Sequence, residues 1–150
     1  QLAGFIGLAG PYDFLPLSNP AYIGMFGNTP KAQARSQPVN FVDGDEPPML
    51  LMQGTGDHYV RPENAYSLAR RMHAVGESAE VRIYPGMGHI HLLLSFSRPL
   101  RAGSTSLRDT MDFIREHGAD STTEPNDTSR CMAAGKPTPD RIRMHAVRAN

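Results

Sequence analysis

Two uncharged apolar segments do the most to limit how this chain can fold. They read LAGFIGLAG at residues 2–10 and PPMLLMQG at residues 47–54, and in both the apolar residues lack the polar alternation of a half-exposed strand. Strands of this kind are buried on both faces, as in a parallel sheet that has helices on each side. Neither segment is long enough to favour a helix, so the sequence predicts two buried strands.

Helix and strand patterns alternate after the second of these strands. Residues 62–76 open on a proline, repeat apolar residues at helical spacing and close on a glycine, and residues 80–84 alternate as a strand does. Residues 90–96 and 106–118 are expected to be helices, the second starting in a capping box at Ser106. Strands joined by crossover helices are parallel, so the predicted fold class is α/β.

The chain divides into two parts by composition. Residues 1–118 contain every predicted strand and helix, including short helices and loops within residues 12–48, and are expected to form one domain. Residues 119–150 are polar and contain no aromatic residue. We expect this second part to be a poorly ordered tail, because it cannot bury enough apolar surface to offset the entropy of folding.

The charge balance argues against several classes of partner. Lys and Arg together number 15, as do Asp and Glu, so no positive excess suggests binding to nucleic acid or to an anionic membrane surface. No apolar run approaches the roughly 20 residues that span a bilayer. The single cysteine, Cys131, excludes an internal disulfide and favours a reducing compartment such as the cytoplasm, while the start at Gln1 leaves targeting signals open. A small uncharged substrate or another protein is the expected partner.

Two ionisable residues follow predicted strands at glycine-rich turns. Asp57 comes after residues 47–54 in the turn GTGD, and His89 comes after residues 80–84 in the turn PGMGH. Functional groups gather beyond the carboxyl ends of parallel strands, so both side chains are expected at one edge of the sheet. A carboxylate that accepts one imidazole N–H fixes the tautomer of the ring and lets it act as a general base. Asp57 could instead be a turn residue that caps the helix expected from Pro62, and His91 competes with His89 for the second role.

Four segments of the chain resemble the C-terminal half of an α/β-hydrolase. They read LAGFIGLAGPYDF, PPMLLMQGTGDHYVRPENAYSLARRM, EVRIYPGMGHIHLLL and DTMDFI, within residues 1–117. They are most similar to the carboxylesterase and lipase-like group that includes kynurenine-formamidase-like members. The resemblance implies the last strands of a doubly wound, mostly parallel sheet, with Asp57 as the acid and His89 as the base of a catalytic triad. It further implies a serine hydrolase of carboxylic esters that needs no cofactor.

The nucleophile motif of that family, G-x-S-x-G, is absent from the 150 residues. We therefore expect the chain to be the downstream portion of a larger enzyme and to be inactive by itself. One alternative is the C-terminal part of a serine peptidase similar to prolyl oligopeptidase, and a cysteine nucleophile would instead indicate a dienelactone-hydrolase-like enzyme. The other alternative, from a different class, is a truncated hydrolase fragment without catalytic function.

The turn after the first predicted strand, GPYDF, offers two candidates for substrate contact. Tyr12 and Phe14 could line a pocket there, or could pack the next segment against the core. The remaining histidines have no carboxylate or histidine partner at metal-ligand spacing, so no metal is expected. If the first strand lacks a neighbour, its apolar edge is exposed, and self-association through that edge is a further hypothesis.

Overall fold

The computed structural model describes residues 2–118 and 145–146. The strands form one parallel sheet in the order β1-β2-β3-β4. They are β1 (Phe5–Leu8), β2 (Met49–Gly54), β3 (Ala79–Tyr84) and β4 (His145–Ala146). The predicted α/β class is confirmed, and the two strands that precede Asp57 and His89 are direct neighbours.

The central strand β2 is buried on both faces, as its continuous apolar sequence predicts. Leu50 and Leu51 are 0% exposed, and Met52 is 1% exposed. Because side chains alternate along a strand, Leu51 packs into the core on one face, and Leu50 and Met52 pack into the core on the other. Full burial of one such side chain stabilises a fold by about 1.5–3 kcal/mol, so β2 anchors both layers.

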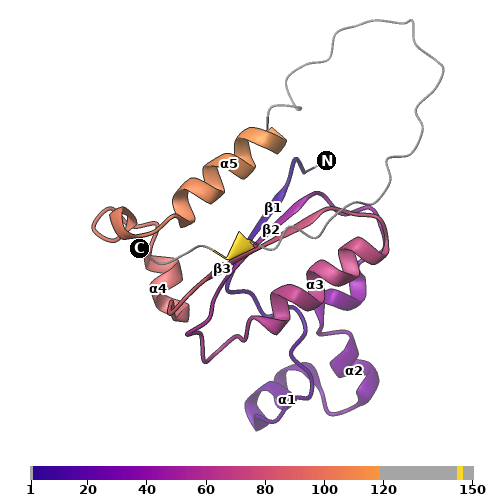
Figure 1. Ribbon diagram of the computed structural model, residues 1–150. Coiled ribbons are helices and arrows are strands. Elements are labelled where there is room, and N and C mark those ends of the chain that lie inside the picture. The colour runs from indigo at the N-terminus through magenta and orange to yellow at the C-terminus, as the bar shows by residue number, and fades with distance from the viewer. Residues whose placement is uncertain (1, 119–144, 147–150) are drawn as a thin grey trace, which may run out of the picture.

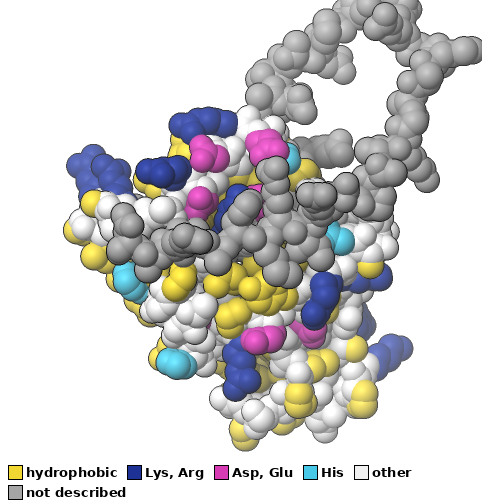
Figure 2. Space-filling view, in the orientation of Figure 1, with side chains coloured by type: hydrophobic (Ala, Val, Ile, Leu, Met, Phe, Trp, Pro, Cys, Tyr) yellow, Lys and Arg dark blue, Asp and Glu magenta, His cyan; other side chains and the backbone are white. Residues whose placement is uncertain are grey.

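Helices cover both faces of the sheet (Figure 1). On one face lies α3 (Glu63–Ala74), which contributes Met72 to the core there. On the other lie α4 (His89–Leu94) and α5 (Ser106–Gly118), which contribute Leu92 and Phe113. The shorter elements are α1 (Pro20–Phe26), α2 (Pro30–Ala34) and the 3-10 helices η1 (Pro38–Phe41) and η2 (Arg101–Gly103). In Figure 2 acidic and basic side chains are interspersed on the visible face, with hydrophobic side chains between them.

The first strand is shorter than predicted and has one neighbour. β1 covers four of the nine residues in the predicted run of residues 2–10. Ala9 ends it, because a φ of 50° turns the backbone out of the extended conformation. Within the described residues β1 pairs with β2 alone, and Phe5 and Leu2 are 39% and 71% exposed. This side of the sheet therefore presents an apolar edge.

The start of α5 differs from the predicted capping box. Ser106 is the first residue of the helix and is fully buried, where its hydroxyl contacts that of Ser95 at 2.6 Å. The backbone N–H of Ser106 is instead capped by the hydroxyl of Ser104 at 3.1 Å. The hydroxyl that reaches Asp109 is that of Thr105, at 3.3 Å, so the predicted pairing of Ser106 with Asp109 is wrong.

Most of the predicted tail, residues 119–150, lies outside the described residues. The exception is β4, which pairs with Arg82 and Ile83 of β3. Among the helices that the structure describes, none has the length and apolarity needed to cross a membrane.

Candidate active site

The turns after β2 and β3 are bonded to each other. The two strands are in register, with Gly54 opposite Tyr84, so both turns leave the sheet at the same level. The backbone N–H of Gly56 donates to the carbonyl of Met87 at 2.9 Å, and the N–H of Gly86 donates to the hydroxyl of Thr55 at 2.8 Å. Two segments that are about 30 residues apart in the chain are thereby held as one edge.

Glycine is what allows the two turns to approach so closely. A Cβ at Gly54 would overlap the carbonyl oxygen of Met87, and one at Gly56 would lie 2.9 Å from the carbonyl oxygen of Gly86. Gly86 itself has a φ of 72°, in the left-handed region that other residues avoid. Steric hindrance therefore explains why glycine occupies these positions in the two turns.

Asp57 is buried at this edge with both carboxylate oxygens hydrogen-bonded. Its Oδ1 accepts from the backbone N–H groups of Tyr59 and Val60, each at 2.9 Å, and its Oδ2 accepts from Nε2 of Gln53 at 2.9 Å. Burial acts to raise the pKa of Asp57, but the N–H donors of Val60 and Tyr59 and the adjacent His89 outweigh it and lower that pKa below its usual value. The side chain is therefore an ionised carboxylate at neutral pH.

His89 completes the pair. It is the first residue of α4, and its Nδ1 lies 2.8 Å from Oδ2 of Asp57. Because an ionised carboxylate only accepts, Nδ1 is the donor and Nε2 is left with the lone pair. The side chain of Asp57 is 1% exposed and that of His89 is 25% exposed, so the imidazole stands between the buried carboxylate and solvent. The arrangement can accept a proton at Nε2 while the carboxylate stabilises the resulting charge.

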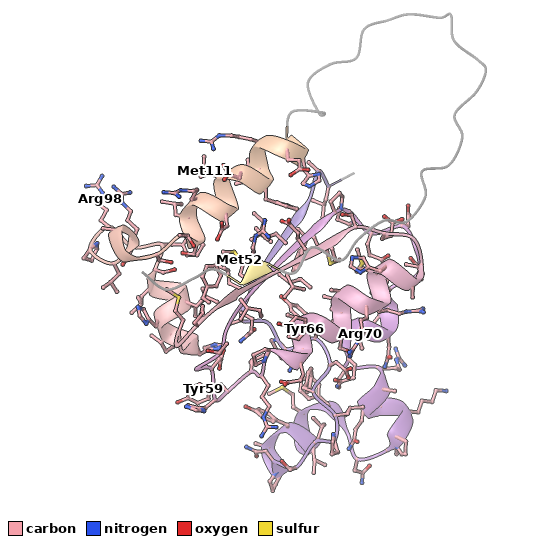
Figure 3. All side chains as sticks on the ribbon, in the orientation of Figure 1. Met52, Tyr59, Tyr66, Arg70, Arg98 and Met111 are labelled. Atoms are coloured by element: carbon pink, nitrogen blue, oxygen red, sulfur yellow. The ribbon has the colours of Figure 1, made fainter. Side chains whose placement is uncertain are left out.

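Tyr59 lies beside the imidazole. Its ring is edge-on to that of His89, with centroids 5.8 Å apart, and it is 83% exposed. Figure 3 shows Tyr59 projecting at the edge of the sheet, far from Met111 on α5 and Arg98. His91, the competing histidine, is exposed on α4 and has no hydrogen bond to Asp57. The choice of His89 over His91 as the partner of Asp57 agrees with the geometry.

Tyr12 and Phe14 lie away from the Asp57–His89 pair. Tyr12 is 8% exposed, belongs to the core under α3 and lines a cavity of about 320 Å³ that also contacts the first residues of β1 and β2. Burial raises the pKa of Tyr12 to about 12. Phe14 packs its ring against Phe26 of α1 at 5.8 Å. Within the described structure neither aromatic ring contacts the ring of His89.

Sequence reasoning missed Gln53, which contacts Asp57 directly. The available signal was a single amide residue in the otherwise apolar strand MLLMQG, since a polar side chain in a buried strand needs a partner. Across the described residues, no cluster of three or more His, Cys, Asp or Glu side chains is arranged to hold a metal ion.

A parallel sheet with a carboxylate bonded to an imidazole beyond two adjacent strands is an arrangement of α/β-hydrolases, and the matches below identify this chain as part of one. Residues 12–121 match the prolyl oligopeptidase family, and the chain belongs to that family.

Three proteins that this chain is similar to carry the names of hydrolases. The carboxylesterase/phospholipase LipF of Mycobacterium tuberculosis is 34% identical over 98 residues, which are 65% of this chain and 25% of that protein. Among solved structures, the apo form of Thermogutta terrifontis esterase 2 matches with a TM-score of 0.56 and 23% identity, over 77% of this chain and 41% of that one. An acetyl ester-xyloside bifunctional hydrolase from Caldicellulosiruptor lactoaceticus matches with a TM-score of 0.52 and 21% identity, over 61% of this chain and 33% of that one.

The two structural matches establish the shared fold. The chain spans about a quarter of the length of the LipF protein that it matches.

Proposed function

We propose that this chain carries the acid and the base of a serine hydrolase that cleaves carboxylic esters. The observation that carries the proposal is the 2.8 Å contact between Nδ1 of His89 and Oδ2 of Asp57. It is supported by the similarity to a carboxylesterase/phospholipase and by the partly exposed position of the imidazole, which a substrate could reach. Asp57 and His89 are the proposed catalytic residues.

In the proposed mechanism His89 moves the proton and Asp57 holds His89. A serine hydroxyl would give its proton to Nε2 of His89 as its oxygen attacks the ester carbonyl carbon, and the imidazolium would return that proton to the departing alkoxide. The carboxylate of Asp57 would keep the proton of Nδ1 in place and stabilise the imidazolium without becoming protonated itself. Water would then release the acyl group by the same proton transfers in the same order.

The nucleophile in this proposal is not one of the serines of this chain. None of them stands in a G-x-S-x-G sequence. Among the serines that the structure describes, the two that are fully buried, Ser95 and Ser106, are hydrogen-bonded to each other. We therefore propose that the serine and the oxyanion-hole N–H groups belong to a segment outside these 150 residues, and that the chain alone does not turn over esters.

The proposed substrate-binding residues, Tyr12 and Phe14, do not contact the Asp57–His89 pair through their rings. Tyr12 and Phe14 lie on the loop after β1. The backbone N–H of Tyr12 donates to Oδ1 of Asn64 at 2.9 Å, and that of Phe14 donates to Oε1 of Gln37 at 2.7 Å. We propose that this anchored loop borders the acyl or alcohol pocket. At the exposed edge of β1, a second copy of the chain is the proposed partner, because unpaired backbone groups beside apolar side chains favour strand pairing.

A second candidate is peptide-bond hydrolysis. The match to the prolyl oligopeptidase family over residues 12–121 favours it, and the same acid and base would serve. Rates on a p-nitrophenyl acyl ester and on a proline-containing peptide anilide separate the two candidates. Each rate is divided by the rate of uncatalysed hydrolysis of the same substrate. A remaining preference of more than about 100-fold for the ester, equal to about 2.7 kcal/mol of transition-state binding, supports the first candidate.

The experiment that tests the proposal compares two histidines in a form of the protein that carries the nucleophile. His89→Ala is expected to abolish turnover of the ester, while His91→Ala, two residues away and exposed, is expected to leave it nearly unchanged. A fluorophosphonate probe, which labels activated serines, should label the parent protein and not the 150-residue chain. Turnover that survives His89→Ala, or labelling of the isolated chain, would contradict the proposal, and a complete absence of turnover in the longer protein would favour a non-catalytic fragment.

A further inference from the structure

A fully buried glutamine lies directly behind the carboxylate of Asp57. Gln53 is the fifth residue of β2 and is 0% exposed. Its Nε2 donates to Oδ2 of Asp57 at 2.9 Å and to the backbone carbonyl of Val60 at 2.8 Å. One amide group therefore bonds to both sides of the turn that presents Asp57.

The orientation of this amide follows from its partners. A carbonyl oxygen and an ionised carboxylate both only accept, so the NH₂ end of Gln53 must face them, and the opposite orientation would bring its oxygen against two acceptors. The consequence is that Oε1 of Gln53 is buried and has no hydrogen-bond partner among the described residues. A buried acceptor without a partner costs free energy, which works against the gain from the two hydrogen bonds of Nε2.

The bonds to Gln53 and His89 meet at one atom. Oδ2 of Asp57 accepts from Nε2 of Gln53 and from Nδ1 of His89, while Oδ1 accepts from two backbone N–H groups of the same turn. Four donors leave the carboxylate no freedom to rotate. Without Gln53, one of the two donors that fix Oδ2 is lost, and the remaining donor is the imidazole itself.

We propose that Gln53 is a positioning residue that orients Oδ2 of Asp57 toward His89 and thereby selects the Nδ1–H tautomer of the imidazole. This inference rests on the proposed function of the pair. It extends that function, since Gln53 is buried behind Asp57 and acts on the reaction through the carboxylate.

The test uses the 150-residue chain and nitrogen-15 NMR of its histidines, which reports the tautomer without any need for turnover. Unsubstituted protein is expected to show His89 in the Nδ1–H form with a low-field Nδ1 proton. Gln53→Met, which keeps the volume and removes both donors, is expected to broaden or lose that proton and to mix the tautomers. Gln37→Met is the matched control: Gln37 is 1% exposed and hydrogen-bonded, but to Phe14 and not to Asp57, so the His89 signal should stay unchanged.

A second measurement needs no substitution of Gln53 and applies if Gln53→Met does not fold. The side-chain amide protons of Gln53 are expected to exchange slowly with solvent and to change frequency in the His89→Gln variant, because both donors share Oδ2. An unchanged His89 signal in Gln53→Met, or Gln53 amide protons that do not respond to His89→Gln, would overturn the inference.

The kinetic test separates this inference from the proposed function. In a form of the protein with the nucleophile, Gln53→Met is expected to lower kcat about 10- to 100-fold and to leave KM within about 2-fold, as misplacement of a catalytic group does. An unchanged kcat would remove the positioning role and leave the roles of Asp57 and His89 intact. An active His89→Ala variant would instead remove the proposed function.

Discussion

The two ends of the central strand β2 differ in how their neighbours are held. At its carboxyl end, Gln53 and the turn through Asp57 are joined to the turn before His89 by hydrogen bonds of 2.8–2.9 Å. At its amino end, Met49 borders an apolar cavity beside Phe5 and Phe41, which are 39% and 62% exposed. The comparison teaches that hydrogen bonds among two strands and two turns position the acid–base pair. The β1 side of the sheet instead presents apolar surface that a second chain or another segment could cover.

The largest expected effect on stability comes from a substitution at the carboxyl end of β2. Gly54→Ala places a Cβ against the carbonyl oxygen of Met87, so the two turns must separate. We expect a loss of about 3 kcal/mol or more in the free energy of unfolding, the scale of severe steric substitutions. Urea denaturation followed by circular dichroism measures it.

The matched control for that variant is Gly24→Ala in α1. Gly24 has no atom within 4 Å of an added Cβ, so the substitution should be neutral or stabilise by up to about 1 kcal/mol through helix propensity. Equal losses in the two variants would show that the close approach of the turns is not what holds the site.

The next effect is acid sensitivity at the same end. Because the pKa of Asp57 is lowered in the folded state, its contribution to stability is present above the unfolded pKa of about 3.9 and is lost as the pH falls through the folded value. The free energy of unfolding is measured for the parent and for Asp57→Asn between about pH 3 and pH 7. The difference between the two proteins should become smaller as the pH falls. A difference that does not change with pH would contradict the ionised, hydrogen-bonded state of Asp57.

A smaller effect is expected at the opposite side of the sheet. If the β1 edge pairs with a second copy, Phe5→Lys should weaken self-association about 10-fold or more, because a charge on an edge strand opposes pairing. Sedimentation velocity over a concentration series measures it, with Tyr22→Lys as the control, since Tyr22 is 52% exposed on α1. Equal dissociation by both variants would place the contact elsewhere.

The smallest expected effect is on stability at Tyr59. Its backbone N–H, and not its side chain, bonds to Asp57, and the side chain is 83% exposed. Tyr59→Ala should therefore change the free energy of unfolding by no more than about 0.5 kcal/mol in thermal or urea melts. A loss above about 1.5 kcal/mol would mean that the ring contact with His89 stabilises the turn.

Much of this contrast could be predicted from sequence. The apolar run before Asp57 and the helical spacing after it indicate a buried parallel strand and a crossover helix, because burial on two faces leaves a continuous pattern. The glycines that flank Asp57 and His89 identify the turns. These patterns reveal the periodicity of apolar residues and the positions where the backbone requires glycine. Both can be seen in a short stretch of sequence.

The remainder depends on contacts between distant residues. No pattern shows that Tyr12 would pack into the core, or that Ala9 would end β1 with a left-handed φ. The role of Gln53 depends on two acceptors that only the folded turn brings together. The sequence likewise did not show which of the adjacent hydroxyl residues Ser104, Thr105 and Ser106 would be buried at the start of α5.

One measurement tests most directly whether Asp57 and His89 act as a unit in catalysis. In a form of the protein that carries the nucleophile, ester turnover is compared for Asp57→Asn with His89 present and with His89 replaced by alanine. The account predicts a fall of about 10⁴ in kcat in the first case and almost no further fall in the second, because the carboxylate acts through the imidazole. The same fall in both backgrounds, or no fall in either, would contradict it.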